Sequence, residues 1–186
     1  MSYLNKLNPI NVIYSKKKCK LKKFDFKIIE VKKMPKVSKD IPISELTLRR
    51  YEKPYKLEKR DLVKKLCLSC GLLQPGDSRD VIVDVLQVLL IAKKDHLELS
   101  SELIKDNVIN IRKAANLPMV GIASSNIRRQ IKRLRDIYLV EKMKNNYRIT
   151  EFDDVSVIFD QKIEQYLLQS VVTRVKDYYK KVDEHF

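Results

Sequence analysis

The amino-acid sequence predicts an α+β fold that is mainly helical, and three patterns of apolar residues indicate it. In residues 58–70, 100–115 and 124–138, apolar residues recur every three or four positions, as they do on one face of a helix, and residues 78–94 are apolar except for one polar stripe. In residues 11–31 they tend to alternate, which favours two or three short strands. Apolar residues in 159–182 keep a spacing of three or four throughout, which predicts one amphipathic helix of about 28 residues.

Charge is distributed unevenly along the chain of 186 residues, whose formal net charge is +15 at pH 7. Residues 1–72 contain 20 Lys or Arg and 7 Asp or Glu, whereas residues 73–186 contain 19 and 17. Polyanions are therefore the expected class of partner. The sequence has no signal-peptide pattern and no apolar run long enough to cross a bilayer, so we expect a cytoplasmic protein that does not contact a membrane.

No pattern of residues indicates a catalytic site or a cofactor. The chain lacks a Gly-rich phosphate loop, a nucleophile with its base, and carboxylates at catalytic spacing, so we do not expect an enzyme. Cys67 and Cys70 form a CxxC motif, but Cys19, His96 and His185 are scattered singly, which disfavours a zinc site with four ligands. The motif ends a predicted helix, and we expect buried, unreactive thiols.

Residues 1–56 are predicted to be a basic, β-containing extension followed by a linker. Lys16–Lys18 would form a loop between the strands, and the other lysines their outward face. These lysines are either a solvated sheet face that blocks aggregation or a second surface that contacts phosphates. Residues 32–54 contain three prolines and no sustained period, which is typical of a linker.

Residues 57–154 are predicted to form the central domain, which begins with two helices. The first ends at Gly71, with Leu62, Leu66 and Cys70 on one face and Val63 and Cys67 beside them. The second is predicted to begin at Ser78 after an Asp77 N-cap and to be buried on several sides. We interpret its polar stripe of Asp80, Asp84 and Gln87 as a solvated seam. A metal site is disfavoured, because no third carboxylate joins the two aspartates.

Two further helices and a hairpin follow. Ser100 is predicted to cap a helix that reaches Ala115, after a short strand in residues 96–99. In the next helix, Ser124 or Ser125 can act as N-cap, and the apolar face comprises Ile127, Ile131, Leu134 and Tyr138. Projecting from the opposite side we expect Ser125, Arg129, Lys132 and Arg133, with Asn126 and Gln130 toward one flank and Arg128 and Arg135 toward the other. Leu139–Val140 would then enter a strand that turns at residues 144–146 and returns through residues 147–149.

The sequences SSNIRRQIKRLRDIYLVEK and NNYRIT carry a resemblance to a known class of proteins. Residues 77–150 resemble archaeal winged helix-turn-helix transcription regulators, broadly similar to the MarR and ArsR classes. The resemblance implies that the helix from Ser124 enters a major groove while the hairpin, or wing, contacts the adjacent backbone or minor groove. Arginine can read guanine, asparagine can read adenine, and flanking cations meet phosphates. The expected DNA-binding residues are Ser125, Asn126, Arg128, Arg129, Lys132, Arg133, Arg135, Lys144, Asn145, Asn146, Tyr147 and Arg148.

These patterns together predict a sequence-specific transcription regulator that binds double-stranded DNA. The alternative is a winged-helix component of the transcription machinery that binds another protein or RNA. Residues 155–186 are predicted to form an amphipathic helix that holds a homodimer, and its alternative use is to pack back over the N-terminal extension.

Overall fold

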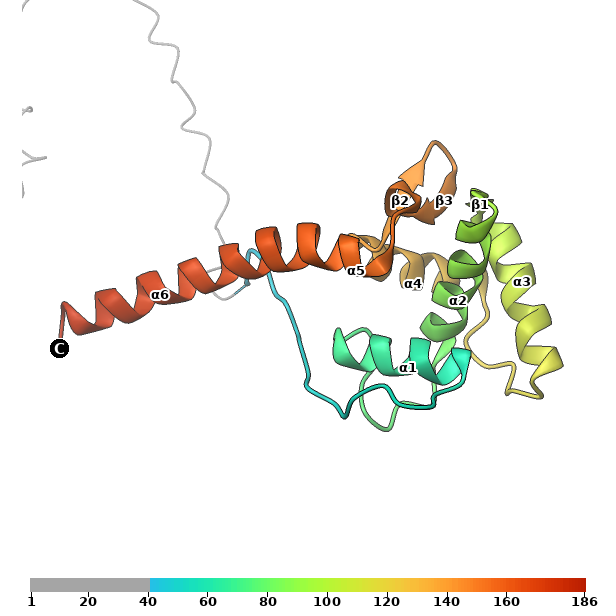
Figure 1. The fold of residues 1–186 in the computed structure, drawn as a ribbon, viewed down its shortest axis with the longest axis horizontal. Helices are drawn as coiled ribbons and strands as arrows, with labels where there is room; N and C mark the ends of the chain where they lie inside the picture. The colour runs from blue at the N-terminus through green and yellow to red at the C-terminus, as the bar shows by residue number, and fades with distance from the viewer. Residues whose placement is uncertain (1–40) are drawn as a thin grey trace, which may run out of the picture. The chain divides into compact units, whose positions relative to one another are not determined.

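The structure is a computed structural model that describes residues 41–186 (Figure 1). The strands predicted in residues 11–31, the loop at Lys16–Lys18 and Cys19 lie outside the described residues. The division into residues 1–56, 57–154 and 155–186 stays a prediction.

The described chain is α+β and mainly helical, as the sequence predicts. Three short strands form one antiparallel sheet in the order β1-β3-β2, in which Leu99 pairs with Tyr147 and Val140 with Ile149. The elements in chain order are α1 (Lys59–Ser69), α2 (Val81–Lys94), β1 (Leu99–Ser100), α3 (Ser101–Ala114), α4 (Ser124–Asp136), β2 (Val140–Met143), β3 (Asn146–Ile149), η1 (Thr150–Phe152), α5 (Val155–Ile158), η2 (Phe159–Leu168) and α6 (Gln169–Asp183).

Helix α2 is the centre of the core. It contacts α1, α3, α4 and β3 (Figure 1), and nine of its 14 residues are buried. This confirms the expectation that so apolar a helix is covered on several sides. Neighbouring helices of the same chain supply this cover.

The ends of the helices agree only in part with the predicted capping residues. The Ser100 hydroxyl accepts a hydrogen bond from the Leu103 N–H at 3.2 Å, which confirms the predicted N-cap of α3. Helix α2 begins at Val81 rather than at Ser78, because Asp77 Oδ1 accepts from the Arg79 N–H at 2.8 Å and closes a turn before the helix. At α4 the N-cap is Ala123, so the prediction of a serine cap is wrong.

Helix α1 ends as predicted, but its buried face is shifted. Gly71 follows the C-cap with φ of 69°, a backbone conformation that favours glycine. Val63 and Cys67 are the buried positions, whereas Leu62 is exposed, so the predicted apolar face lies one residue too early. Burial raises the pKa of the Cys67 thiol to about 12, which confirms the expectation of an unreactive thiol there.

The segment predicted as a linker has no helix or strand within residues 41–54, but part of it is fixed to α1. The Arg49 guanidinium donates to the carbonyl oxygens of Leu68 and Leu73 at 2.9 and 3.2 Å. A Cβ atom at Gly71 would lie 2.6 Å from Thr47 Cβ, so the glycine also permits this close approach. Residues 47–49 therefore pack on the C-terminal turn of α1.

The polar stripe of α2 is a buried ion cluster, so its interpretation as a solvated seam is wrong. Asp84 is fully buried, and its carboxylate accepts from Arg60 Nε at 2.9 Å and from Arg112 Nη1. Asp80 accepts from Arg60 Nη2 at 2.7 Å and from Arg112 Nη1 at 3.1 Å. The cluster joins α1 and α3 to α2, and two guanidinium groups compensate the charge of its two carboxylates.

The C-terminal residues form one continuous helical run, α5, η2 and α6, in which η2 has π-helical hydrogen bonding. Ile158, Ile163 and Leu167 in its first half are buried, whereas α6 has no buried residue. In the described part of the chain, no helix is both long enough and apolar enough to cross a membrane.

Candidate nucleic-acid interface

Helix α4 is fixed to the core by the apolar face that its sequence predicts. Ile127, Ile131 and Leu134 are each no more than 1% exposed. Tyr138 lies beyond the end of the helix, has a φ of 61° and is 39% exposed, so its assignment to that apolar face is wrong.

The opposite face of α4 is strongly basic and exposed. It comprises Ser125, Arg128, Arg129, Lys132 and Arg135, which we call the basic face. At 100° per residue, Ser125 and Lys132 lie along its middle, with Arg128 and Arg129 to either side. Arg128 and Arg135, expected on a flank, are thus part of the exposed face itself.

Few acidic groups compensate the charge of the basic face. Arg128 Nη2 lies 3.7 Å from Glu102 Oε1, too long for a good hydrogen bond. Hydrogen bonds, chiefly from the Ser101 hydroxyl, hold the pKa of Glu102 below its ordinary value, so this carboxylate stays charged beside Arg128. Within residues 41–186, neither Lys132 nor Arg135 forms an ion pair.

One flank of α4 carries a chain of hydrogen bonds within the protein. Asn126 Nδ2 donates to the Gly121 carbonyl at 2.6 Å, and Gln130 Nε2 donates to Asn126 Oδ1 at 2.9 Å. Arg133 donates to Gln130 Oε1 at 3.0 Å and to the Leu72 carbonyl at 2.5 Å. Arg133 is half-buried, so the expectation that it projects from the free side is wrong. Asn126 and Arg133 hold the helix between the preceding loop and the turn after α1.

The loop before α4, residues 115–123, is fixed by the buried ion cluster. Arg112 donates to the Pro118 carbonyl from Nε at 2.9 Å and from Nη2 at 2.6 Å. Gly121 has a φ of 80°, and a Cβ atom there would lie 3.1 Å from Val81 Cγ2. The guanidinium that neutralises Asp84 therefore also determines where α4 begins.

Arg129 connects the basic face to this internal network. Its Nη2 donates to Asn126 Oδ1 at 2.8 Å, while the side chain as a whole remains exposed. The hydrogen bond orients the guanidinium toward the first turn of α4 and leaves its other donors free.

The hairpin after α4 has a two-residue tip, Lys144–Asn145, closed by the pair Met143 and Asn146. The turn lies within the predicted residues 144–146, and its left-handed residue is Lys144, with φ of 55°. Lys144 and Asn145 are exposed, and Asn146 is half-buried. The exposed Lys142 was missed, because alternation along β2 places it on the same side as the buried Val140 and so does not reveal its exposure.

Two hairpin residues that were expected to contact DNA instead make contacts within the protein. Arg148 donates to Glu141 Oε1 at 2.8 Å and to Glu98 Oε1 at 3.3 Å, and its guanidinium lies 4.7 Å from the centre of the Phe152 ring. Tyr147 is half-buried and packs against the core. Both residues stabilise the base of the hairpin instead of pointing freely from its tip.

An aromatic pair lies just beyond α4. Tyr138 and Tyr166 meet edge to face with their ring centres 6.4 Å apart, and Tyr166 is 65% exposed. The sequence pattern did not reveal this pair, because Tyr138 matches the spacing of the buried face and Tyr166 belongs to a different helix.

Neither metal ligands nor a matching protein adds to this description. Within residues 41–186, no group of three or more His, Cys, Asp or Glu side chains is placed to hold a metal ion. A comparison with family models, curated proteins and solved structures found no match to this chain.

Proposed function

We propose that residues 77–150 form a winged helix-turn-helix that binds double-stranded DNA, with α4 in the major groove and the tip of the β2–β3 hairpin on the backbone. The order α2, β1, α3, α4, β2, β3 and the pairing of β1 with β3 support this proposal, because they follow the pattern of the proteins that the sequence resembles. In a helix-turn-helix, the second helix of the motif presents base-reading side chains while the first crosses the backbone. Here those helices would be α4 and α3.

The basic face of α4 is the observation on which the proposal depends. Three arginines and a lysine project from a single helix whose other side is packed against the core. Within the described residues the one ion pair that they form is that of Arg128 with Glu102, and Asp136 lies one turn after Lys132. Duplex DNA offers phosphates along both edges of a groove and guanine acceptors on its floor, which matches such a helix.

The geometry assigns different roles to the side chains of α4. Ser125, Arg128, Arg129 and Lys132 lie on the first two exposed turns, so we assign them to the groove, where the arginines can read guanine bidentately. Arg135 is at the C-terminal end of the helix and would meet phosphate, as would Lys142 and Lys144 of the hairpin. Asn126 and Arg133 position the helix and do not read bases.

The biological role that fits this chemistry is transcription regulation. Single-stranded RNA is the second candidate partner, and one observation favours it. Exposed aromatic rings provide stacking platforms for unpaired bases, and Tyr138 and Tyr166 form such a surface beyond the end of α4.

Selection from a pool of random duplexes, followed by competition titrations, tests the proposal. Arg128→Ala and Arg129→Ala should each remove roughly 1–3 kcal/mol of discrimination at one base position. Arg135→Ala should weaken binding to all sequences about equally. Lys94→Ala is the matched control, because it removes an exposed positive charge at the end of α2, outside the basic face.

Two results would overturn the proposal. One is retention of every base preference by both the Arg128→Ala and Arg129→Ala variants. The other is tighter binding of single-stranded RNA than of any selected duplex, together with loss of that RNA binding in Tyr166→Ala.

A further inference from the structure

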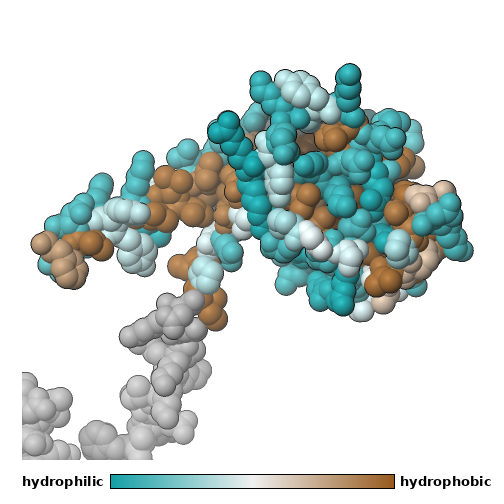
Figure 2. Space-filling model, turned by 90° about the horizontal axis from the view of Figure 1, so that it is seen from below, coloured by the Kyte–Doolittle hydropathy of each residue, from teal (hydrophilic) through white to brown (hydrophobic). Residues whose placement is uncertain are grey.

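The C-terminal helical run divides into a covered half and an uncovered half. The first half contains three buried residues, Ile158, Ile163 and Leu167, whereas no residue of α6 is buried. Helix α6 nevertheless carries an apolar stripe, which a last hydrogen-bonded turn after Asp183 extends to Phe186. Figure 2 shows hydrophobic surface along this segment, at the left of the view. The stripe comprises Val171, Val172, Val175, Tyr178, Tyr179, Val182 and Phe186.

The stripe is too regular for a solvated helix. At 100° per residue its seven members fall within an arc of about 120°, with Val175 at the centre. A helix exposed to water on all sides has no reason to keep its apolar residues on one face. The arrangement matches the seam of a helix pair, in which apolar residues recur every three and four positions.

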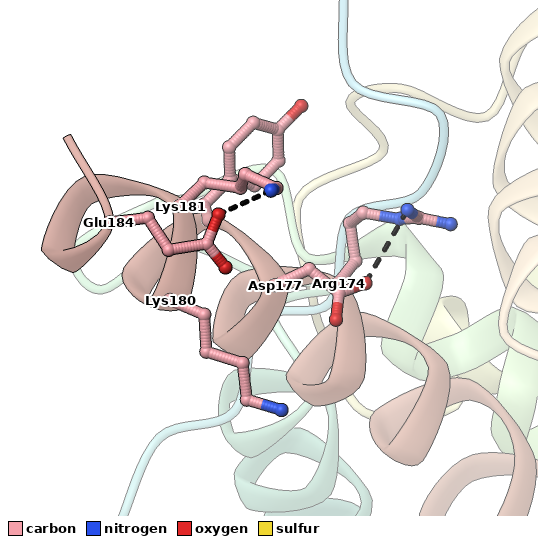
Figure 3. A pocket seen from close by; sticks show the side chains of 6 residues that line it. Arg174, Asp177, Lys180, Lys181 and Glu184 are labelled. Atoms are coloured by element: carbon pink, nitrogen blue, oxygen red, sulfur yellow. Dashed lines mark hydrogen bonds and ion pairs between the residues drawn. The ribbon is translucent and has the colours of Figure 1, made fainter.

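Charges beside the stripe favour a second copy of this chain as the occupant over a polyanion. The chain as a whole has a net charge of +15, but residues 169–186 contain four basic and three acidic side chains. Figure 3 shows the polar side of α6, where Arg174 and Asp177 form an ion pair at 3.5 Å and Lys181 is paired with Glu184. A balanced helix of this kind attracts polyanions weakly and does not repel a copy of itself.

We propose that α6 pairs with α6 of a second copy of this chain through the stripe, giving a homodimer in the absence of DNA. Tyr178, Tyr179 and Phe186 are 70%, 72% and 106% exposed. Because an aromatic side chain can bury about 150–250 Å², these three offer roughly 500 Å² per copy. With the valines, the pair would bury about 1,000–1,200 Å² in total, the lower end of the range for specific interfaces. Association also has to offset the lost translational and rotational freedom of two copies, so we expect a dimer that dissociates on dilution.

Sedimentation equilibrium of the full chain without DNA tests this inference independently of the proposed function. Wild type should change from monomer to dimer between about 1 and 100 μM. Val175→Asp should raise the dissociation constant at least tenfold, because pairing would bury an uncompensated charge in the centre of the stripe. Thr173→Asp is the matched control: it adds the same charge on the exposed opposite side of α6 and should leave the constant within twofold.

Circular dichroism checks that each variant remains folded, and Tyr179→Glu provides a second substitution should Val175→Asp misfold. Monomeric wild type throughout that concentration range would overturn the inference. Equal weakening by Val175→Asp and Thr173→Asp would overturn it too, since the stripe would then not be the interface.

Discussion

Removal of the Asp84 carboxylate should destabilise the protein far more than the loss of a surface ion pair. Asp84 is fully buried, and the Arg112 side chain that it neutralises is 2% exposed. In Asp84→Ala, Arg112 keeps only Asp80 as an anionic partner, at 3.1 Å, and the Pro118 carbonyl. Breaking a buried pair by removing one member costs about 3–5 kcal/mol, a large part of the roughly 5–15 kcal/mol that stabilises a typical domain.

Thermal unfolding followed by circular dichroism measures this cost. For a chain of this size, about 1 kcal/mol corresponds to roughly 2–4 °C, so Tm should fall by about 6–20 °C in Asp84→Ala. The matched control is Asp154→Ala, which removes an exposed carboxylate paired with Lys93 and should leave Tm close to that of wild type. Equal, small losses in the two variants would refute the conclusion that the cluster holds α1, α2 and α3 together.

Three further outcomes are expected. Burial raises the pKa of Asp80, but hydrogen bonds from Arg60 and Arg112 outweigh this effect and hold that pKa below its ordinary value. The stabilising contribution of this carboxylate is therefore present above about pH 4 and is lost as the pH falls through its folded-state pKa. Urea unfolding at descending pH checks this, and a wild-type minus Asp80→Asn difference that stays constant with pH would contradict it. Arg133→Ala should lower Tm without changing base preference, because its guanidinium bonds to Leu72 and Gln130; a changed preference in the competition titration would make it a reader. Deletion of residues 1–33, which contain ten Lys and two acidic residues, should weaken binding to specific and random duplexes alike. It should also reduce the slope of log affinity against log salt by about 0.9 per lost phosphate contact. An unchanged slope would mean that these lysines only face solvent.

Local sequence patterns predict the elements of this fold well. The spacing of Ile127, Ile131 and Leu134 identifies the buried side of α4, and Ser100 and Gly71 mark helix ends by their own chemistry. At Asp77 and Ser124 the capping predictions are wrong because a side chain that can cap a helix can equally close a turn, as Asp77 does, or stay unused, as Ser124 does one residue inside the helix.

Pairing between distant residues is what the sequence patterns do not predict. Asp84 meets Arg60 and Arg112, which are 24 and 28 residues away, and periodicity shows only that Asp84 lies on a polar stripe. Arg133 likewise looks like its exposed neighbours until the Leu72 carbonyl, 61 residues away, is brought beside it. The division of α4 into a reading face and a positioning flank therefore depends on tertiary structure.

Directed cleavage from α4 tests the central proposal most directly. A cysteine introduced by Ser125→Cys, in a chain with Cys19→Ser and Cys70→Ser, would carry an iron chelate that cuts nearby DNA, and the buried Cys67 would stay unlabelled. We predict cuts on both strands within the selected site, with the strand offset of a major-groove reagent. The same chelate attached through Thr173→Cys serves as the control and should give no such pattern. Minor-groove offsets from Ser125→Cys, or no cleavage of a duplex that the labelled protein binds, would contradict insertion of α4 into the major groove.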